Sequence, residues 1–244
     1  LFENSPDLRD TVDVLICVGQ TPDQPIPHNA SQVVEALGLP DTVASFDISL
    51  GCSGYVYGLK IAEGFLAATG KKNAVLVTCD PYSRIMAADN KDTHCVFGAA
   101  AAATWVSAQD GQGIVVALDF GTDGSGAHAI EVPAGGARKP SVSLGQDDTH
   151  HYDREELGLH MEGRAVFNCV NKRIPQSISN CLDAAGLTLD DIDLFALHQG
   201  SVYMLDALAK RVGIPQDKLL KNMNRYGNTV SSSIPLLLSE LHAR

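Results

Sequence analysis

The sequence predicts an α/β protein whose helices cover the faces of its sheets. Apolar runs rich in β-branched residues, typical of strands buried on both faces, alternate with segments in which apolar residues recur at helical spacing. Glycine and proline mark the boundaries between these segments, with 22 Gly and 11 Pro in 244 residues. Alternation of this kind is typical of chains that pack helices against sheets.

Five apolar runs in the first half of the chain are predicted strands. They lie at 12–20, 44–50, 73–80, 96–107 and 113–122. The fourth run is so rich in alanine that another element is expected to pack very close to it. Two helices are predicted between the strands. One spans 29–40 with Asn29 or Ser31 as its N-cap, and the other spans 53–69 and stops at Gly70.

The amino-acid composition changes at the start of the second half of the chain. Residues 121–160 are largely polar and punctuated by glycine and proline, which predicts an excursion over the surface. Helical spacing returns over 162–184, where Pro175 is expected to break the helix into two segments. A buried strand is predicted over 194–199, followed by a helix over 203–212 and an amphipathic run near the end.

The charge and hydropathy of the chain exclude some classes of partner. The formal net charge is −11, and a field of that sign repels nucleic acid and anionic membrane surfaces, so neither is expected as a partner. No stretch approaches the roughly 20 uninterrupted apolar residues of a membrane helix. The opening "LFENSPDLRD" lacks the basic start and apolar core of a secretory signal.

The six cysteines are scattered and contain no C-x-x-C pair. They are Cys17, Cys52, Cys79, Cys95, Cys169 and Cys181. Most lie in apolar surroundings, which is typical of reduced thiols in a cytoplasmic protein rather than of a disulfide framework or a metal site. We therefore predict a cytoplasmic protein without a structural metal.

Cys52 is the cysteine whose setting indicates chemistry. It lies in "SFDISLGCSGYVYGL", in the turn between a predicted strand and a predicted helix. The free N–H groups and the dipole of that helix are expected to stabilise a thiolate and lower the pKa of the thiol. Gly51 and Gly54 permit a sharp turn and the close approach of a ligand. A buried structural cysteine remains the alternative interpretation at this point.

Two further segments carry polar residues where α/β proteins build sites. His198 ends the predicted strand in "LFALHQGS", and Asn228 follows a glycine in "NRYGNTVSSSIP". Taken singly, the histidine fits a hydrogen bond to the backbone and the asparagine fits an ordinary turn or cap. Their occurrence together with Cys52, in the order Cys, His, Asn, favours a catalytic site.

In the segments around Cys52, His198 and Asn228 quoted above, the sequence resembles the β-ketoacyl-acyl-carrier-protein synthase III branch of condensing enzymes in the thiolase superfamily. Weaker matches are "VFGAAAAATWVS" and "HMEGRAVF". The resemblance implies a five-layered αβαβα fold of two pseudo-duplicated halves, incomplete at both termini in this chain. It places a half with the nucleophile at 1–120, substrate-pocket loops at 121–160 and a half with His198 and Asn228 at 161–244.

The resemblance also implies an activity and its residues. An acyl group from acyl-CoA or acyl-carrier protein would pass to Cys52, and a malonyl thioester, on carrier protein or CoA, would then condense with loss of CO₂. His198 and Asn228 would stabilise the enolate. No cofactor beyond the thioester substrates is implied, and the protein would act in fatty acid biosynthesis as a homodimer. The residues implied for thioester binding are Gly163, Arg164, Phe167, Gly200 and Ser201. Lys210 and Arg211 are implied to dock a carrier protein, and a solvated face of the helix is an equally consistent interpretation of these two charges.

The chain departs from the family pattern at several points. Ala99-Ala100 replaces a usual Asp-Gly, and Ser201 and Tyr203 replace an Asn and a docking Arg in the histidine loop. The family's glycine-rich loop near the C-terminus, which completes an oxyanion hole, has no counterpart here. Two alternatives therefore stay open: acyl transfer to an oxygen or nitrogen acceptor in secondary metabolism, and a non-catalytic partner subunit. For thioester binding, Phe167 is equally consistent with core packing.

Overall fold

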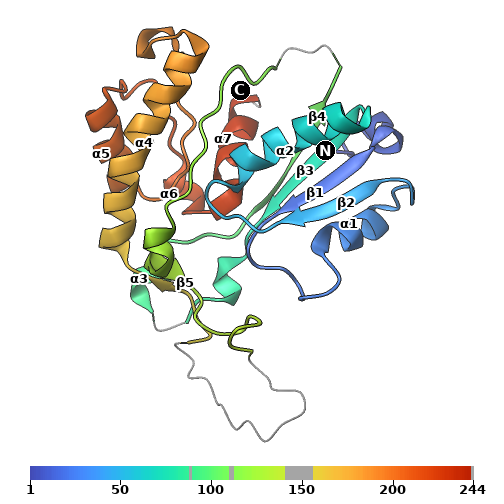
Figure 1. The fold of residues 1–244 in the computed structure, drawn as a ribbon, viewed down its shortest axis with the longest axis horizontal. Coiled ribbons are helices and arrows are strands. Elements are labelled where there is room, and N and C mark those ends of the chain that lie inside the picture. The colour runs from blue at the N-terminus through green and yellow to red at the C-terminus, as the bar shows by residue number, and fades with distance from the viewer. Residues whose placement is uncertain (88–89, 110–112, 141–155, 243–244) are drawn as a thin grey trace, which may run out of the picture.

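A four-stranded mixed sheet forms the centre of the first half of the chain in the computed structural model, which describes residues 1–87, 90–109, 113–140 and 156–242 (Figure 1). Its strands, in the order β2-β1-β3-β4, are β1 (Val14–Val18), β2 (Ala44–Ile48), β3 (Asn73–Cys79) and β4 (Ala101–Ser107). β1 pairs in parallel with both β2 and β3, whereas β4 runs antiparallel to β3. The carboxyl ends of the three parallel strands therefore meet at one edge.

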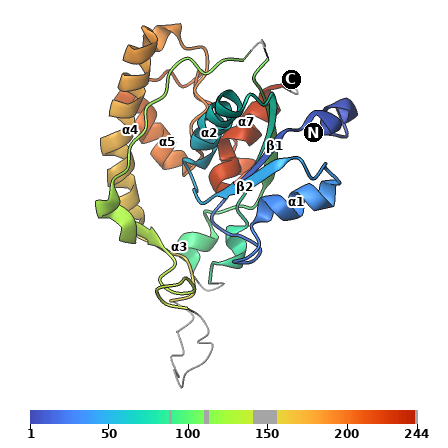
Figure 2. The same ribbon diagram turned by 45° about the vertical axis from the view of Figure 1, so that its right-hand side comes forward.

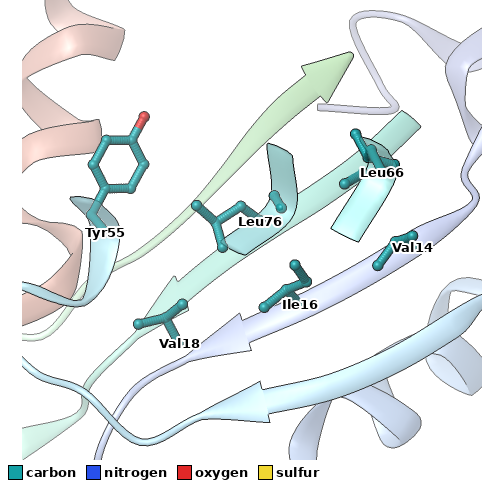
Figure 3. Close-up of a cluster of buried hydrophobic side chains, with 8 residues drawn as sticks. Val14, Ile16, Val18, Tyr55, Leu66 and Leu76 are labelled. Atoms are coloured by element: carbon teal, nitrogen blue, oxygen red, sulfur yellow. The ribbon is translucent and has the colours of Figure 1, made fainter. Parts of the chain in front are cut away.

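The two faces of the sheet bury separate clusters, as the alternation of side chains along a strand requires. On one face Val14, Ile16 and Val18 of β1 join Leu76 of β3 and pack against a helix, as Figure 3 shows. On the other face Leu15 of β1 lies in a second buried cluster. All five residues of β1 are buried, which explains the unbroken apolar run of its sequence.

Two helices cover these faces. α2 (Gly54–Thr69) covers the first face and ends at Gly70, whose φ of 69° is the left-handed conformation expected of a C-terminal stop. α1 (Asn29–Leu37) covers the second face. The prediction of Asn29 or Ser31 as its N-cap is wrong. His28 is the N-cap, and Asp47 of β2 accepts hydrogen bonds from the first helical N–H groups, at 2.7 Å from that of Asn29.

The second half of the chain is mainly helical. Its helices are α4 (Gly163–Ala185), α5 (Val202–Val212), α6 (Met223–Tyr226) and α7 (Ser233–His242). α7 packs near β4 and extends the helical layer on the α2 side of the sheet, while α4 and α5 lie beyond it (Figures 1 and 2). α4 is continuous through Pro175, so the expected break is absent. A proline removes one backbone donor, and the remaining bonds of a 23-residue helix carry it past that position.

Short elements complete the fold. They are the 3₁₀ turns Pro6–Thr11, Tyr82–Arg84, Gly124–Ala129, Leu189–Asp191 and Val230–Ser232, the short helix α3 (Lys91–His94), and the paired strands β5 (Ile130–Glu131) and β6 (His160–Met161). Much of the predicted surface excursion, residues 141–155, lies outside the described residues. No helix in the described part of the chain has the length and apolarity needed to cross a membrane.

Three strand predictions need correction. Residues 113–122 form no strand; the segment runs alongside α4, where Asn180 donates a hydrogen bond of 3.0 Å to Asp119 (Figures 1 and 2). The strand predicted over 194–199 is reduced to one isolated bridge between Phe195 and Leu219. The strand predicted over 96–107 begins only at Ala101. In the first of these segments the apolar side chains of Ile114, Val115, Val116 and Phe120 are exposed, so apolar composition alone did not indicate burial in a sheet.

Candidate active site

The carboxyl edge of the sheet collects the polar residues that follow each parallel strand. Gln20 follows β1, Cys52 follows β2 and Asp80 follows β3. Asp80 is fully buried, and its Oδ1 accepts a hydrogen bond of 2.7 Å from the backbone N–H of Gln20. A Cβ at Gly51 would overlap the side-chain oxygen of Gln20, so this glycine lets the Gln20 side chain pack closely against the cysteine turn. The fold thus places the cysteine turn against a buried carboxyl group.

Cys52 lies just before the N-cap of α2 but does not have the acidic thiol that this location predicts. Solvent reaches its side chain, yet the thiol is surrounded by protein on most sides, and this burial raises its pKa to about 11, with the charge of Asp80 acting in the same direction. A backbone hydrogen bond at Cys52 itself opposes the shift only in part. The expectation of a lowered pKa is therefore wrong, because burial and a nearby carboxyl outweigh the helix terminus.

Asn228 is held by its backbone beside the start of β4. Its N–H donates to the carbonyl of Val96 at 2.9 Å, and its carbonyl accepts from the N–H of Gly98 at 2.8 Å. A Cβ at Gly98 would overlap the carbonyl oxygen of Tyr226, so only glycine allows the two segments to approach this closely. The side chain is also fixed, because Oδ1 accepts a hydrogen bond of 2.9 Å from the N–H of Val230. That bond leaves Nδ2 as the donating group of the amide.

Val230 has an unusual backbone at the centre of this turn. Its φ is 53°, a left-handed conformation that is rare for a β-branched residue, and its side chain is fully buried. Strain of this kind persists only where surrounding contacts over-determine it, and it concentrates at functional sites. The bond from Val230 N–H to Asn228 is one of those contacts.

Two buried serines after Val230 join this turn to the sheet. Ser231 donates to Oδ2 of Asp80 through its hydroxyl at 2.5 Å, and its N–H lies 3.3 Å from the same oxygen. Ser232 lies 2.9 Å from the hydroxyl of Thr78 and 3.1 Å from the carbonyl of Ala100. Since β3 and the turn are about 150 residues apart in sequence, these bonds connect the two halves of the chain at the site.

His198 is the third sequence-predicted residue, and it meets the same turn. Its Nδ1 lies 2.7 Å from the hydroxyl oxygen of Ser233. Burial lowers the pKa of its imidazole to about 4, while a hydrogen bond with the backbone of Val230 acts in the opposite direction. The ring is therefore neutral near pH 7 and carries one donor and one acceptor nitrogen.

The turn over residues 228–233 brings all three predicted residues into one neighbourhood. It contains Asn228 and contacts His198 through Ser233. The glycines on either side of Cys52 also face it: positions for a Cβ at Gly51 and Gly54 lie 3.2 Å from Val230 and 3.7 Å from Ser231, respectively. The imidazole of His198 and the amide of Asn228 thus contact one strained turn, and the backbone that carries Cys52 lies next to it.

The residues implied for thioester binding lie at the beginnings of α4 and α5. Gly163 and Arg164 begin α4 and are exposed. Phe167 stacks on Tyr203, with ring centroids 5.4 Å apart, so the aromatic that replaces the family's docking arginine covers this phenylalanine. Ser201 is the N-cap of α5 and accepts a hydrogen bond of 3.1 Å from the N–H of Met204. Its neighbour Gly200 lies close to the His198 ring.

Lys210 and Arg211 lie in the last turn of α5 and are exposed. The other basic residues of this region are engaged within the protein. Lys218 donates to the carbonyl of Ile192 at 2.6 Å, Lys221 pairs with a carboxylate of α5, and Arg225 pairs with one of α7. Lys210 and Arg211 form no ion pair with any residue that the structure describes.

Comparisons with known proteins show the family of the chain. A family model described as 3-oxoacyl-[acyl-carrier-protein] synthase III matches residues 46–124, and its C-terminal counterpart matches 182–244. A relative from Lactococcus lactis, beta-ketoacyl-[acyl-carrier-protein] synthase III, is 30% identical over 240 residues, which cover 98% of this chain and 71% of the relative. The chain belongs to the 3-oxoacyl-acyl-carrier-protein synthase III family.

Other members of the family extend the comparison. Beta-ketoacyl-[acyl-carrier-protein] synthase III 3 from Streptomyces coelicolor is 34% identical, with 96% of this chain and 69% of the relative covered. The crystal structure of 3-oxoacyl-(acyl-carrier protein) synthase from Burkholderia xenovorans matches with a TM-score of 0.86 at 32% identity, covering 98% of this chain and 67% of that one. The fold is therefore the thiolase-type α/β fold of this family, as the sequence motifs imply.

Several residues of the site were not singled out from the sequence. Asp80 directly follows an apolar strand in "VLVTCDP", and the three serines follow Asn228 in "NTVSSSIP". A carboxylate at the carboxyl end of a buried strand was a usable signal, but its partner was not visible from sequence. No group of three or more metal-ligating side chains gathers in the part of the chain that the structure describes.

Proposed function

We propose that this chain catalyses acyl transfer to Cys52 followed by decarboxylative Claisen condensation with malonyl-carrier protein or malonyl-CoA, giving a 3-oxoacyl thioester. Membership of the family supports this activity. The observation that carries the residue assignment is that His198 and Asn228 contact the turn over residues 228–233 while the glycines flanking Cys52 lie near it. Thioesters are the substrates, and the proposed reaction needs no other cofactor.

In the first step the sulfur of Cys52 attacks the acyl thioester. The bond from Sγ to the acyl carbon forms, the bond from that carbon to the CoA sulfur breaks, and the thiol proton leaves with the CoA thiol. Because the pKa of the Cys52 thiol is raised to about 11, the resting cysteine is protonated near neutral pH. The thiol of Cys52 therefore loses its proton during its attack on the thioester and not before it.

In the second step a malonyl thioester loses CO₂. The electron pair of the broken C–C bond becomes an enolate, and its oxygen is stabilised by hydrogen bonds from His198 and from Nδ2 of Asn228. The enolate carbon then attacks the acyl carbon, the new C–C bond forms, the bond from that carbon to Sγ of Cys52 breaks, and the Cys52 thiolate that leaves takes up a proton from solvent. Neutral donors suit this task, because the only charge to be stabilised is the developing oxyanion.

Two variants test this assignment. Incubation with acyl-CoA, followed by intact-protein mass measurement, should give an acyl adduct on the wild-type chain and none on Cys52→Ala. The matched control is Cys95→Ala, which removes another exposed cysteine and should keep the adduct. An adduct that persists on Cys52→Ala would refute the role of Cys52. Acyl transfer to an oxygen or nitrogen acceptor is the alternative, and it predicts no CO₂ release from a malonyl thioester.

We also propose a carrier-protein docking role for Lys210 and Arg211. Their exposure and lack of ion pairs within the described chain support a basic surface for an acidic partner, although the net charge of the protein is −11. Reversing both charges should reduce turnover with malonyl-carrier protein and leave turnover with malonyl-CoA intact. Equal losses with both substrates would contradict docking at this surface.

The same proposal includes thioester binding at the beginnings of α4 and α5, and a cytoplasmic homodimer. The free state of all six cysteines fits a reducing compartment. β2 and β4 each have a neighbour on one side only within the described sheet, so either edge offers backbone groups for a second copy. Sedimentation analysis tests the dimer, and a monomer at micromolar concentration would contradict it.

A further inference from the structure

A buried hydroxyl contacts the ring of His198 from the beginning of α7. Ser233 is 2% exposed, and its Oγ lies 2.7 Å from Nδ1 of His198, 35 residues away in sequence. We propose that Ser233 is a positioning residue that holds His198 as the tautomer with its proton on Nε2, so that the ring meets a thioester carbonyl as a hydrogen-bond donor. This inference rests on the proposed function and names a residue for the same site.

The direction of the hydrogen bonds around Ser233 supports this tautomer. The backbone N–H of Gln199 donates to Oγ of Ser233 at 3.4 Å. The hydroxyl proton of Ser233 is buried and needs an acceptor, and Nδ1 of His198 is the only acceptor that it meets among the described residues. If Ser233 donates to Nδ1, the single proton of the neutral ring is on Nε2.

The opposite tautomer of His198 leaves one buried hydrogen-bond donor without an acceptor among the described residues. With the proton on Nδ1, Ser233 would accept from both His198 and Gln199, and its own proton would have no acceptor in the described part of the chain. The hydrogen bond between His198 and the backbone of Val230 involves the imidazole ring and provides no acceptor for the hydroxyl proton of Ser233. A buried donor left without a partner costs about 1–3 kcal/mol, which is enough to select one tautomer.

The surroundings keep this arrangement rigid. Gln199 is fully buried, and its side chain donates to the carbonyl of Leu197 at 2.8 Å and accepts from the N–H of Asn222 at 3.1 Å. Its backbone N–H is thereby fixed against Ser233. Burial also favours the neutral imidazole, since it lowers the pKa of His198 to about 4. A neutral ring with a fixed donor is what enolate stabilisation requires.

The test compares Ser233→Ala with Ser233→Thr and Ser232→Ala. Long-range ¹H–¹⁵N correlation spectra of the ¹⁵N-histidine-labelled full chain report the tautomer of each ring, and the His198→Asn variant assigns the His198 signals. We expect the Nε2–H form in the wild type, a shift away from it in Ser233→Ala, and its retention in Ser233→Thr. Ser232→Ala removes an adjacent buried hydroxyl that bonds Thr78 instead, so it should keep the tautomer.

Kinetics complete the test. Ser233→Ala should lower CO₂ release from malonyl-carrier protein about 10- to 100-fold, somewhat less than the loss of a whole oxyanion donor, while the acyl adduct on Cys52 still forms. A wild-type ring protonated on Nδ1, or the same tautomer in Ser233→Ala and wild type, would overturn the inference. If the wild type forms no adduct and releases no CO₂, the proposed function fails, but the tautomer remains measurable separately.

Discussion

Lowering the pH from 7 to 5 should destabilise this protein through His198. The pKa of the ring is about 4 in the folded protein, against 6.5 for an unperturbed histidine. As the pH falls below 6.5, the unfolded chain binds a proton at this ring and the folded chain does not. The contribution of His198 to stability is therefore fully present above pH 6.5 and is lost as the pH falls toward 4.

The size of the effect follows from the two pKa values. At pH 5 the unfolded ring is almost fully protonated, whereas the folded ring, with its pKa of about 4, is mostly neutral. Linkage then gives a loss of about 2 kcal/mol in the free energy of unfolding between pH 7 and pH 5 from this one residue. That is a large fraction of the stability of an ordinary domain.

Urea unfolding of the wild type and His198→Asn at pH 5, 6 and 7, followed by far-ultraviolet circular dichroism, isolates this contribution. The other titrating groups are common to both proteins, so they cancel in the difference between the two unfolding free energies. That difference should rise by about 2 kcal/mol from pH 5 to pH 7 in favour of the wild type. Parallel pH profiles would refute the reasoning, because they would mean that the ring titrates alike in the folded and unfolded chains.

Three further predictions follow from packing and charge. Gly98→Ala should lower the free energy of unfolding by about 2–3 kcal/mol, because its Cβ would overlap the carbonyl of Tyr226; thermal unfolding measures this, and an unchanged melting temperature would contradict it. Asp80→Asn should lower the pKa of Cys52 from about 11 and speed its alkylation by iodoacetamide at pH 8; an unchanged rate would mean that burial alone raises that pKa. Leu76→Ala should cost about 2–5 kcal/mol in urea unfolding, since the side chain is fully buried in the core of Figure 3.

The sequence was sufficient to predict elements that are determined by their own residues, such as a strand with an unbroken apolar run or a helix that ends at a glycine. β1 and β3 are buried on both faces, so their apolar runs are unbroken, and α2 ends where a glycine takes the left-handed conformation. The segment 113–122 has the same composition as a buried strand but no ladder in the structure. A strand needs a partner backbone, and composition does not reveal whether a partner is there.

The candidate site also contains residues that the sequence indicated and residues that it did not. Cys52, His198 and Asn228 lie in sequence motifs that predict a catalytic site, and this assignment stays a prediction. In the structure Asn228 belongs to the turn over residues 228–233, His198 contacts it through Ser233, and the glycines that flank Cys52 lie near it. The residues that support them were hidden because their partners are distant in sequence: Ser233 bonds a ring 35 residues away, and Asp80 bonds a serine 151 residues away. In the sequence, the three serines after Val230 indicate only the start of a helix. Their hydrogen-bond partners become visible only in the folded structure.

The electrostatics of the site give the strongest reason to revise the initial picture of a thiolate at a helix terminus. With a pKa of about 11 for the thiol and about 4 for the imidazole, proton transfer from Cys52 to His198 is unfavourable by a pKa difference of about seven, so the neutral thiol and neutral imidazole are favoured over a thiolate and an imidazolium. Both groups are therefore uncharged across the whole physiological range. The attacking sulfur must lose its proton as the thioester bond breaks. A negative charge then develops on the thioester oxygen in the acyl-transfer step, and another develops on the enolate oxygen when the malonyl group loses CO₂. Donors that are already neutral and fixed, as Ser233 fixes His198, stabilise that charge without having to exchange a proton first.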